Sequence, residues 1–206
     1  MNNTLLQLPY EIVDVTATTP FFFRNGQVFK SKDQFGIYLC TKGHIEASMN
    51  GKKYDVKATF FMVGDNVRKH PDEFRLIVEN GHRLGNHTFN HIGGFRWKNK
   101  DYLENADKAD RLIHTNLFRP PHGWMRWGQY YVLSKRYRVV MWDLVTRDYS
   151  KWVDADGVYR NIRRYARNGS IITFHDSLKS IEKLHTALPR SIEWLKAHGY
   201  EFRVFE

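Results

Sequence analysis

Short apolar or β-branched runs alternate with longer amphipathic stretches along most of this chain. Such alternation predicts a β/α protein with a largely parallel sheet. The expected strands lie at residues 35–40, 56–63, 83–87, 117–120, 138–142, 170–175 and 201–205. The expected helices lie at residues 66–79, 102–113, 128–136, 155–166 and 181–198. No internal repeat or linker interrupts the pattern, so one continuous domain is expected over residues 1–206.

The length and the cysteine content limit what this domain can contain. A chain of 206 residues can bury one good core and is too short for two domains of ordinary size. Cys40 is the only cysteine, which excludes an intramolecular disulfide and a cysteine-based zinc cluster. Any bound metal must therefore use histidine and carboxylate ligands.

The formal net charge of +10 raises the question of a nucleic-acid partner. The basic residues are scattered, however, and the densest group has the spacing of a solvated helix face: Arg160, Arg163, Arg164 and Arg167. We expect no nucleic-acid partner, and an acidic glycan would account for the charge equally well. The amino terminus lacks a secretory signal pattern and no apolar run could span a membrane, so the chain is expected to be soluble and cytoplasmic.

Two histidines follow the strand expected over residues 83–87. In α/β sheets, ligands bind at the carboxyl ends of strands, so polar groups in this position are the first candidates for function. His87 and His91 are four residues apart, and in a helical segment their imidazoles would lie on one face, close enough to share a cation. The alternative is a chance pair, because ten histidines are scattered along the chain.

A second candidate, the segment Arg119-Pro120-Pro121-His122-Gly123, lies at the end of the strand expected over residues 117–120. Its two prolines and its glycine fix an unusual backbone, which can aim amide N–H groups inward as an oxyanion hole. Arg119 can orient a carboxylate. The alternative is a rigid turn with a solvent-facing arginine.

Asp148 and His175 form the third candidate group. His175 ends the strand expected over residues 170–175, and Asp148 follows the one expected over residues 138–142. Asp148 could accept a hydrogen bond from a histidine and set its tautomer and pKa, or it could cap a turn. A histidine at the end of a hydrophobic strand is usually a core residue, but beside Asp148 it would be a general acid.

Taken in order, these segments resemble the polysaccharide deacetylase family, also called the NodB homology domain or carbohydrate esterase family 4. The likeness runs from Val56 to the C-terminus and places the motif-bearing part at about residues 35–206. The matching segments follow one another as they do in the family: Lys57-Ala58-Thr59-Phe60-Phe61 for its second strand, His87 to His91 for H-[ST]-x-x-H, Arg119 to Gly123 for R-P-P-[YH]-G, Asp148-Tyr149 for D-[WY], and Phe174-His175-Asp176 for the terminal histidine motif.

The resemblance implies a distorted (β/α) barrel of about seven strands that hydrolyses N-acetyl groups on a polysaccharide or oligosaccharide such as peptidoglycan or a chitin-like polymer. It also implies a divalent metal, usually zinc, held by His87 and His91. In this chemistry the ion polarises the acetamide carbonyl and lowers the pKa of water. A carboxylate then removes a proton from the water, and a histidine protonates the departing amine.

The remaining roles are also implied by the resemblance. His175 would be the acid, oriented by Asp148, and Arg119 would belong to the same catalytic set. Pro121, His122 and Tyr149 would contact the substrate or the oxyanion.

The match breaks at the first strand. In the family this strand ends in T-F-D-D-G, which supplies the base and the third metal ligand, whereas the strand expected over residues 35–40 continues as Cys40-Thr41-Lys42-Gly43. His44 or Glu46 could substitute as ligand or base, since both residue types bind zinc. Alternatively, the protein binds carbohydrate without catalysis, or residues 40–55 are a local sequence anomaly. We expect a deacetylase whose activity is impaired or altered.

Overall fold

The core of the molecule is a seven-stranded parallel sheet. The computed structural model describes residues 14–17, 38–39, 45–49, 52–54, 56–177 and 179–205. The sheet has the order β8-β7-β6-β5-β1-β10-β9. Its strands, in chain order, are β1 (Asp14–Ala17), β5 (Thr59–Met62), β6 (Arg83–Asn86), β7 (Leu117–Phe118), β8 (Arg138–Val139), β9 (Leu144–Val145) and β10 (Ile172–Asp176). Because β8 and β9 are both edge strands, the (β/α) barrel is open between them.

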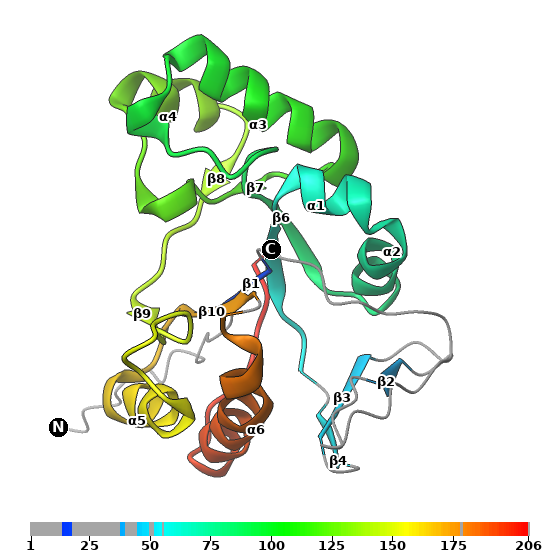
Figure 1. Cartoon of the computed structure of the whole chain (residues 1–206), viewed down its shortest axis with the longest axis vertical. Coiled ribbons are helices and arrows are strands. Elements are labelled where there is room, and N and C mark those ends of the chain that lie inside the picture. The colour runs from blue at the N-terminus through cyan, green and yellow to red at the C-terminus, as the bar shows by residue number, and fades with distance from the viewer. Residues whose placement is uncertain are drawn as a thin grey trace, which may run out of the picture.

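In the part of the chain that the structure describes, six helices cover this sheet and two short 3-10 turns lie on its connections. The helices are α1 (Gly64–Lys69), α2 (Pro71–Glu79), α3 (Asn99–Ile113), α4 (Trp127–Leu133), α5 (Ala155–Tyr165) and α6 (Ile181–Ala197), and the turns are η1 (Gly94–Arg96) and η2 (Pro121–Gly123). Figure 1 shows α3 and α4 at one end of the molecule and the pair α5 and α6 at the other, with the strands between them. None of the helices in the described part is both long and apolar enough to cross a membrane.

The single helix expected over residues 66–79 is in fact two helices. The chain breaks at His70, whose backbone has φ −132° and ψ 62°, and α2 begins at Pro71. A proline disfavours helical backbone in the residue before it and is well tolerated at the first helical position. The expectation of one helix was therefore wrong because the apolar stripe continues across a backbone break.

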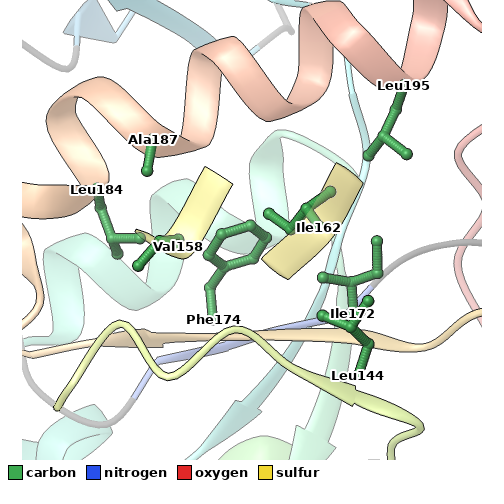
Figure 2. Close-up of a cluster of buried hydrophobic side chains, with 8 residues drawn as sticks. All are labelled: Leu144, Val158, Ile162, Ile172, Phe174, Leu184, Ala187 and Leu195. Carbon is green, nitrogen blue, oxygen red and sulfur yellow. The ribbon is translucent and has the colours of Figure 1, made fainter. Parts of the chain in front are cut away.

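The two carboxy-terminal helices pack on β10 through apolar side chains. Figure 2 shows Phe174 of β10 between α5 and α6, beside Val158 and Ile162 on α5 and Leu184 on α6. All four side chains are at least 93% buried, since the most exposed of them is 7% accessible. Burying a side chain of this size stabilises the fold by about 1.5–3 kcal/mol. This cluster holds β10, and with it His175, in a fixed position.

The first strand of the barrel is not the one expected from the sequence. The central place between β5 and β10 is taken by β1, with Val15 in register with Phe60 and Thr16 in register with His175. Tyr38 and Leu39, within the expected strand over residues 35–40, instead form β2 of a separate antiparallel sheet. A short apolar run indicates a strand but does not show which sheet the strand joins.

The small antiparallel sheet consists of β2 (Tyr38–Leu39), β3 (Ile45–Met49) and β4 (Lys52–Tyr54). Figure 1 shows it to one side of the parallel sheet. The strand expected over residues 201–205 is also wrong, since that segment contains only an isolated bridge at Phe202. Four strands were not anticipated from the sequence: β1, β3, β4 and the two-residue β9.

The neutral His82 side chain joins the start of β6 to the start of β5 through a hydrogen bond. Its Nδ1 accepts a hydrogen bond from the Ala58 N–H at 3.1 Å, and burial, followed by the charge of Lys57, lowers its pKa to about 4. In the unfolded chain a histidine has a pKa of about 6.5. Below that pH the unfolded chain therefore binds a proton that the folded protein excludes, and folding stability falls as the pH decreases.

We expect the free energy of unfolding to fall by about 2 kcal/mol through His82 between pH 7 and pH 4.5, with the full contribution present above pH 6.5. The His82→Asn variant keeps an acceptor near the Ala58 amide but does not titrate. Its free energy of unfolding, measured by urea unfolding across this pH range, should therefore fall less steeply as the pH decreases. Equal slopes for the two proteins would contradict this assignment.

Candidate active site

His87 and His91 lie in the loop that follows β6, and this loop is not helical. Its path is bent by positive φ values at Thr88 (62°) and His91 (55°). Buried Asn86 stabilises the bend, since its Oδ1 accepts the Thr88 N–H at 2.9 Å and its Nδ2 donates to Ala106 O. The helical geometry considered for this pair was therefore wrong, but the two imidazoles still meet, with ring centroids 4.9 Å apart.

His87 is held as a neutral imidazole with a defined tautomer. Its ring is buried, and Nδ1 lies 2.7 Å from the Arg119 carbonyl oxygen. A carbonyl oxygen only accepts, so Nδ1 carries the proton and Nε2 is left unprotonated. Burial, and then the neighbouring His91, lower the pKa of His87 to about 3. Burial, then His122 and His175, lower the pKa of His91 to about 4. Both rings are thus uncharged at neutral pH, as metal ligands must be.

The turn η2 places a third imidazole beside this pair. His122 has φ 59° and is followed by Gly123 with φ 75°. The His122 ring is exposed, and its centroid lies 4.8 Å from that of His91. The Gly123 N–H donates to Pro120 O at 3.0 Å, and the oxyanion role expected of this turn stays a prediction. Positive φ at a non-glycine residue is costly and is concentrated at functional sites.

Arg119 is the largest fully buried side chain in the described part of the chain, at 1% exposure. The solvent-facing alternative for it is therefore wrong. Its guanidinium donates to Val140 O at 3.2 Å, to Met141 O at 2.6 Å and to the Thr173 hydroxyl at 3.5 Å. The guanidinium also stacks on the Phe61 ring. Arg119 therefore joins β5, β10 and the segment after β8 across the interior of the barrel, and its catalytic role stays a prediction.

Asp148 and His175 form a hydrogen-bonded pair at the carboxyl end of β10. The fully buried Asp148 carboxylate binds His175 twice, through Oδ1 to the ring Nδ1 at 2.8 Å and through Oδ2 to the backbone N–H at 2.6 Å. Because the carboxylate accepts from Nδ1, the outer nitrogen Nε2 is left for proton transfer. Lys183 donates to the carbonyl oxygens of Asp148 and Ser150 and fixes this loop. Tyr149 packs edge-on against His175, with ring centroids 4.7 Å apart.

These groups face one another across the mouth of the open barrel. A positive charge on His175 would lower the pKa of both His87 and His91, so the three imidazoles lie within electrostatic reach. Strands β6 and β10 are parallel through β5 and β1, and their carboxyl ends therefore share one edge. The bridge from Arg119 to Thr173 shows that the sheet curls far enough for β7 to reach β10.

The break in the family motif must be moved to the end of β1. The chain continues from this strand as Thr18-Thr19-Pro20, so by sequence order Thr16-Ala17-Thr18-Thr19 corresponds to T-F-D-D, again without a carboxylate, although residues 18 and 19 lie outside the described residues. Residues 40–43, to which the sequence assigned the break, lie outside the described residues, and the strand before them, β2, pairs with β3 in the separate antiparallel sheet. His44 and Glu46 stay predictions as substitute ligands or bases. The backbone of Glu46 belongs to β3, but its side chain is not described, and His44 lies wholly outside the described residues.

The donor set fits two ligands of a divalent metal ion. His87 and His91 provide neutral imidazoles of the type that zinc prefers. Their ring separation of 4.9 Å agrees with the roughly 5 Å expected for two imidazoles on one tetrahedral ion. Within the described ranges, no group of three histidine, cysteine, aspartate or glutamate side chains is arranged to hold an ion.

An exposed aromatic surface adjoins the site and was not anticipated from the sequence. It lies around η1 and α4 and consists of Phe95, Trp97, Trp124, Trp127, Tyr130 and Tyr131. Gln129 fixes the two segments together, since its Nε2 donates to Gly94 O and its Oε1 accepts the Arg126 N–H. The only sequence signal was the density of aromatic residues after each histidine motif.

The fold and the site together define a (β/α) barrel with a histidine centre and an aspartate-histidine pair at the carboxyl edge of its sheet. The profile of the polysaccharide deacetylase family matches residues 51–133. A peptidoglycan-N-acetylglucosamine deacetylase of Bacillus cereus is 29% identical over 159 residues, which cover 73% of this chain and 58% of the relative. The chain is therefore similar in sequence to the polysaccharide deacetylase family.

Solved structures agree on the fold. The peptidoglycan deacetylase PdaC from Bacillus subtilis has a TM-score of 0.70 at 21% identity and covers 95% of this chain and 88% of its own. A pseudoenzyme of carbohydrate esterase family 4 from Bacillus anthracis has a TM-score of 0.64 at 25% identity and covers 73% of this chain and 54% of its own. A mutant of that pseudoenzyme has restored enzymatic activity.

Proposed function

We propose that the protein is a metal-dependent deacetylase that hydrolyses N-acetyl groups of a glycan, at a rate limited by the lack of a carboxylate after β1. The observation that carries this proposal is the placement of the His87–His91 pair and the Asp148–His175 pair at one edge of the barrel. The deacetylase relatives act on N-acetylglucosamine in peptidoglycan by their names, which supports a glycan carrying that sugar as substrate.

Each pair has a distinct task in this proposal. A divalent metal ion held by His87 and His91 supplies Lewis acidity toward the acetamide carbonyl. His175 donates a proton from Nε2 to the departing amine, and Asp148 holds its ring in the tautomer and orientation that this step needs. The backbone of η2 supplies hydrogen-bond donors toward the oxyanion. Removal of the water proton is the step to which this proposal assigns none of the described residues.

The test is acetate release from N-acetylglucosamine oligosaccharides and from peptidoglycan fragments. We expect slow release that stops on addition of a chelator and in the His87→Ala variant. The matched control is His114→Ala, because His114 is exposed at the end of α3, away from the site. Turnover that continues after metal removal, or that survives His87→Ala, would overturn the proposed function.

The aromatic surface supports binding of a polymer rather than of a single sugar. Trp127 is 86% exposed, Trp124 63% and Phe95 56%, and exposed apolar patches of this kind mark interaction sites. The rings of Phe95 and Trp124 lie 6.1 Å apart, and Trp124 directly follows η2. Flat aromatic faces give large contact area at a low cost in conformational entropy. Sugar units flanking the reacting one would therefore stack here.

Replacing Trp127 with alanine should weaken binding of a long N-acetylglucosamine oligosaccharide by roughly 10-fold, because about 1.4 kcal/mol of stacking is lost. Binding of the disaccharide should change little, since it does not extend beyond the reacting edge. Isothermal titration calorimetry with both ligands measures the difference. Tyr165→Ala is the control, because Tyr165 is similarly exposed but ends α5, at the opposite end of the molecule. Equal loss in both variants would contradict a specific role for the surface.

A second candidate function is carbohydrate binding without catalysis. Thr18 and Thr19 at the place of the two aspartates favour it, and a pseudoenzyme is among the similar solved structures. This candidate predicts saturable binding of the same oligosaccharides with acetate release at background. The acetate and calorimetry measurements made on one preparation separate the two functions.

A further inference from the structure

An open hollow of about 520 Å³ lies between the segment that follows β9 and the first turns of α5 and α6. Its volume falls in the range that small-ligand sites occupy. The side chains that line it include three cations, two carboxylates and one large aromatic ring: Lys151, Arg160, Lys183, Asp154, Glu182 and Trp152. The proposed deacetylation assigns no task to this hollow.

The hollow adjoins the side of the candidate active site that carries the proton donor. Lys183, which lines the hollow, donates from Nζ to the Asp148 carbonyl oxygen at 2.8 Å. Tyr149, the next residue along the chain, packs edge-on against the His175 ring. Lys151 is only three residues after Asp148, so their Cα atoms are at most about 11 Å apart. When the reacting sugar lies at His175, the hollow is therefore within reach of a neighbouring sugar.

This hollow and the exposed aromatic surface lie on different sides of the site. The aromatic surface surrounds η1 and α4, beside the turn that carries His122. The hollow lies at α5 and α6, which Figure 1 shows at the opposite end of the molecule from α3 and α4. A glycan chain that crosses the site can therefore contact both.

Trp152 gives the hollow an exposed ring with a cation beside it. Its side chain is 83% exposed, and the Nζ of Lys151 lies 4.7 Å from the centroid of its ring. An exposed indole offers a flat apolar face on which a sugar ring can stack. The indole thus keeps an ammonium group next to the place where such a ring would lie.

The charges of the hollow favour an anionic group on the ligand. Within the described part of the chain, neither Lys151 nor Lys183 forms an ion pair with a carboxylate. The carboxylates of the hollow have other roles: Asp154 caps α5 through a backbone N–H at 2.7 Å and lies 3.9 Å from Arg160, and Glu182 is in the first turn of α6, where a negative charge stabilises the helix. A carboxylate on the ligand would supply the partner that the two lysines lack.

We propose that this hollow binds a carboxylate-bearing sugar next to the sugar that loses its acetyl group, with Trp152 stacked on its ring and Lys151 paired with its carboxylate. The inference rests on the proposed function and narrows its substrate to a glycan in which N-acetylglucosamine alternates with an acidic sugar, such as N-acetylmuramic acid with its lactyl carboxylate. A neutral chitin-like polymer would bind less tightly.

The test compares the binding of three tetrasaccharides to the full chain by isothermal titration calorimetry. They are N-acetylchitotetraose, a tetrasaccharide in which N-acetylglucosamine alternates with N-acetylmuramic acid, and the same tetrasaccharide with its lactyl carboxylates converted to methylamides. We expect the acidic tetrasaccharide to bind roughly 5-fold more tightly than either neutral one, which is the upper range for one exposed ion pair. High salt should reduce this preference.

The Lys151→Met variant should lose the preference for the acidic tetrasaccharide. Lys196→Met is the matched control, because it removes the same charge from an exposed position in the last turn of α6, at the other end of that helix from the hollow, and it should keep the preference. Lys151 is exposed, so its replacement should leave the unfolding midpoint unchanged. A shared midpoint then excludes misfolding as the cause of the lost preference.

The outcomes separate this inference from the function beneath it. Equal affinity of the unmodified protein for all three ligands, or a preference that survives Lys151→Met, would overturn the inference. Acetate release without any binding preference means that the inference fails while the proposed function stands. A preference without acetate release means that the hollow binds the acidic sugar while the proposed catalysis fails.

Discussion

Replacing Thr18 and Thr19 together with aspartate should raise acetate release by on the order of 10²- to 10⁴-fold, the usual contribution of a positioned general base. Both residues directly follow β1, whose Thr16 is in register with His175 and whose Ala17 is in register with Asp176. A carboxylate at the start of this connection would therefore enter the edge that carries the histidines. The rate is measured on N-acetylglucosamine oligosaccharides with metal present.

The control for this gain is the Thr41→Asp, Lys42→Asp double variant. It adds the same two carboxylates to the connection between β2 and β3, which follows the apolar run at residues 35–40. We expect no gain from it. A rise in both variants, or in neither, would show that the end of β1 is not the place where the base is missing.

Replacing Arg119 with methionine should lower the free energy of unfolding by about 3 kcal/mol. The carbonyl oxygens of Val140 and Met141 would lose a buried donor, and each unsatisfied buried group costs about 1–3 kcal/mol. Burial also lowers the pKa of Arg119 to about 9, so the folded protein already bears a desolvation cost that the variant removes. The net loss of unfolding free energy therefore stays below the summed contributions of the hydrogen bonds of Arg119. Urea unfolding at neutral pH measures it.

Arg75→Met is the matched control, since it makes the same substitution at an exposed position. Arg75 forms an ion pair with Asp72 in which both side chains are 65% exposed, and such pairs contribute little. The free energy of unfolding of Arg75→Met should lie within about 0.5 kcal/mol of that of the unmodified protein. If the two variants unfold at the same urea concentration, Arg119 does not brace the barrel.

The candidate site was largely predictable because its residues sit in short local motifs. His87, Arg119, Asp148 and His175 each follow a strand, and parallel strands bring their carboxyl ends together whatever the details of the loops. The identity of the first strand was not predictable in this way. Asp14–Ala17 is short and begins with a charged residue, so its pattern is weaker than the apolar run at residues 35–40.

Local conformation escaped prediction wherever a backbone choice depended on distant contacts. His91 meets His87 through a positive φ value and through the hydrogen bond that Asn86 donates to Ala106 O in α3, and no spacing rule contains either. Arg119 donates to the carbonyl oxygens of Val140 and Met141, contacts that its sequence motif does not indicate, because the curl of the sheet encloses it. The approach of His122 to His91 likewise depends on where η2 lies after folding.

The position of β1 has a consequence for how the chain folds. This strand pairs with β5 on one side and with β10 on the other, and the ribosome delivers β10 only after β5 to β9 have been made. Pairings between such remote segments raise contact order and slow folding, because a large loop must close before the contact forms. During synthesis one edge of β1 therefore stays unpaired until β10 is made, and the pairings of β10 with β1 and β9 form last.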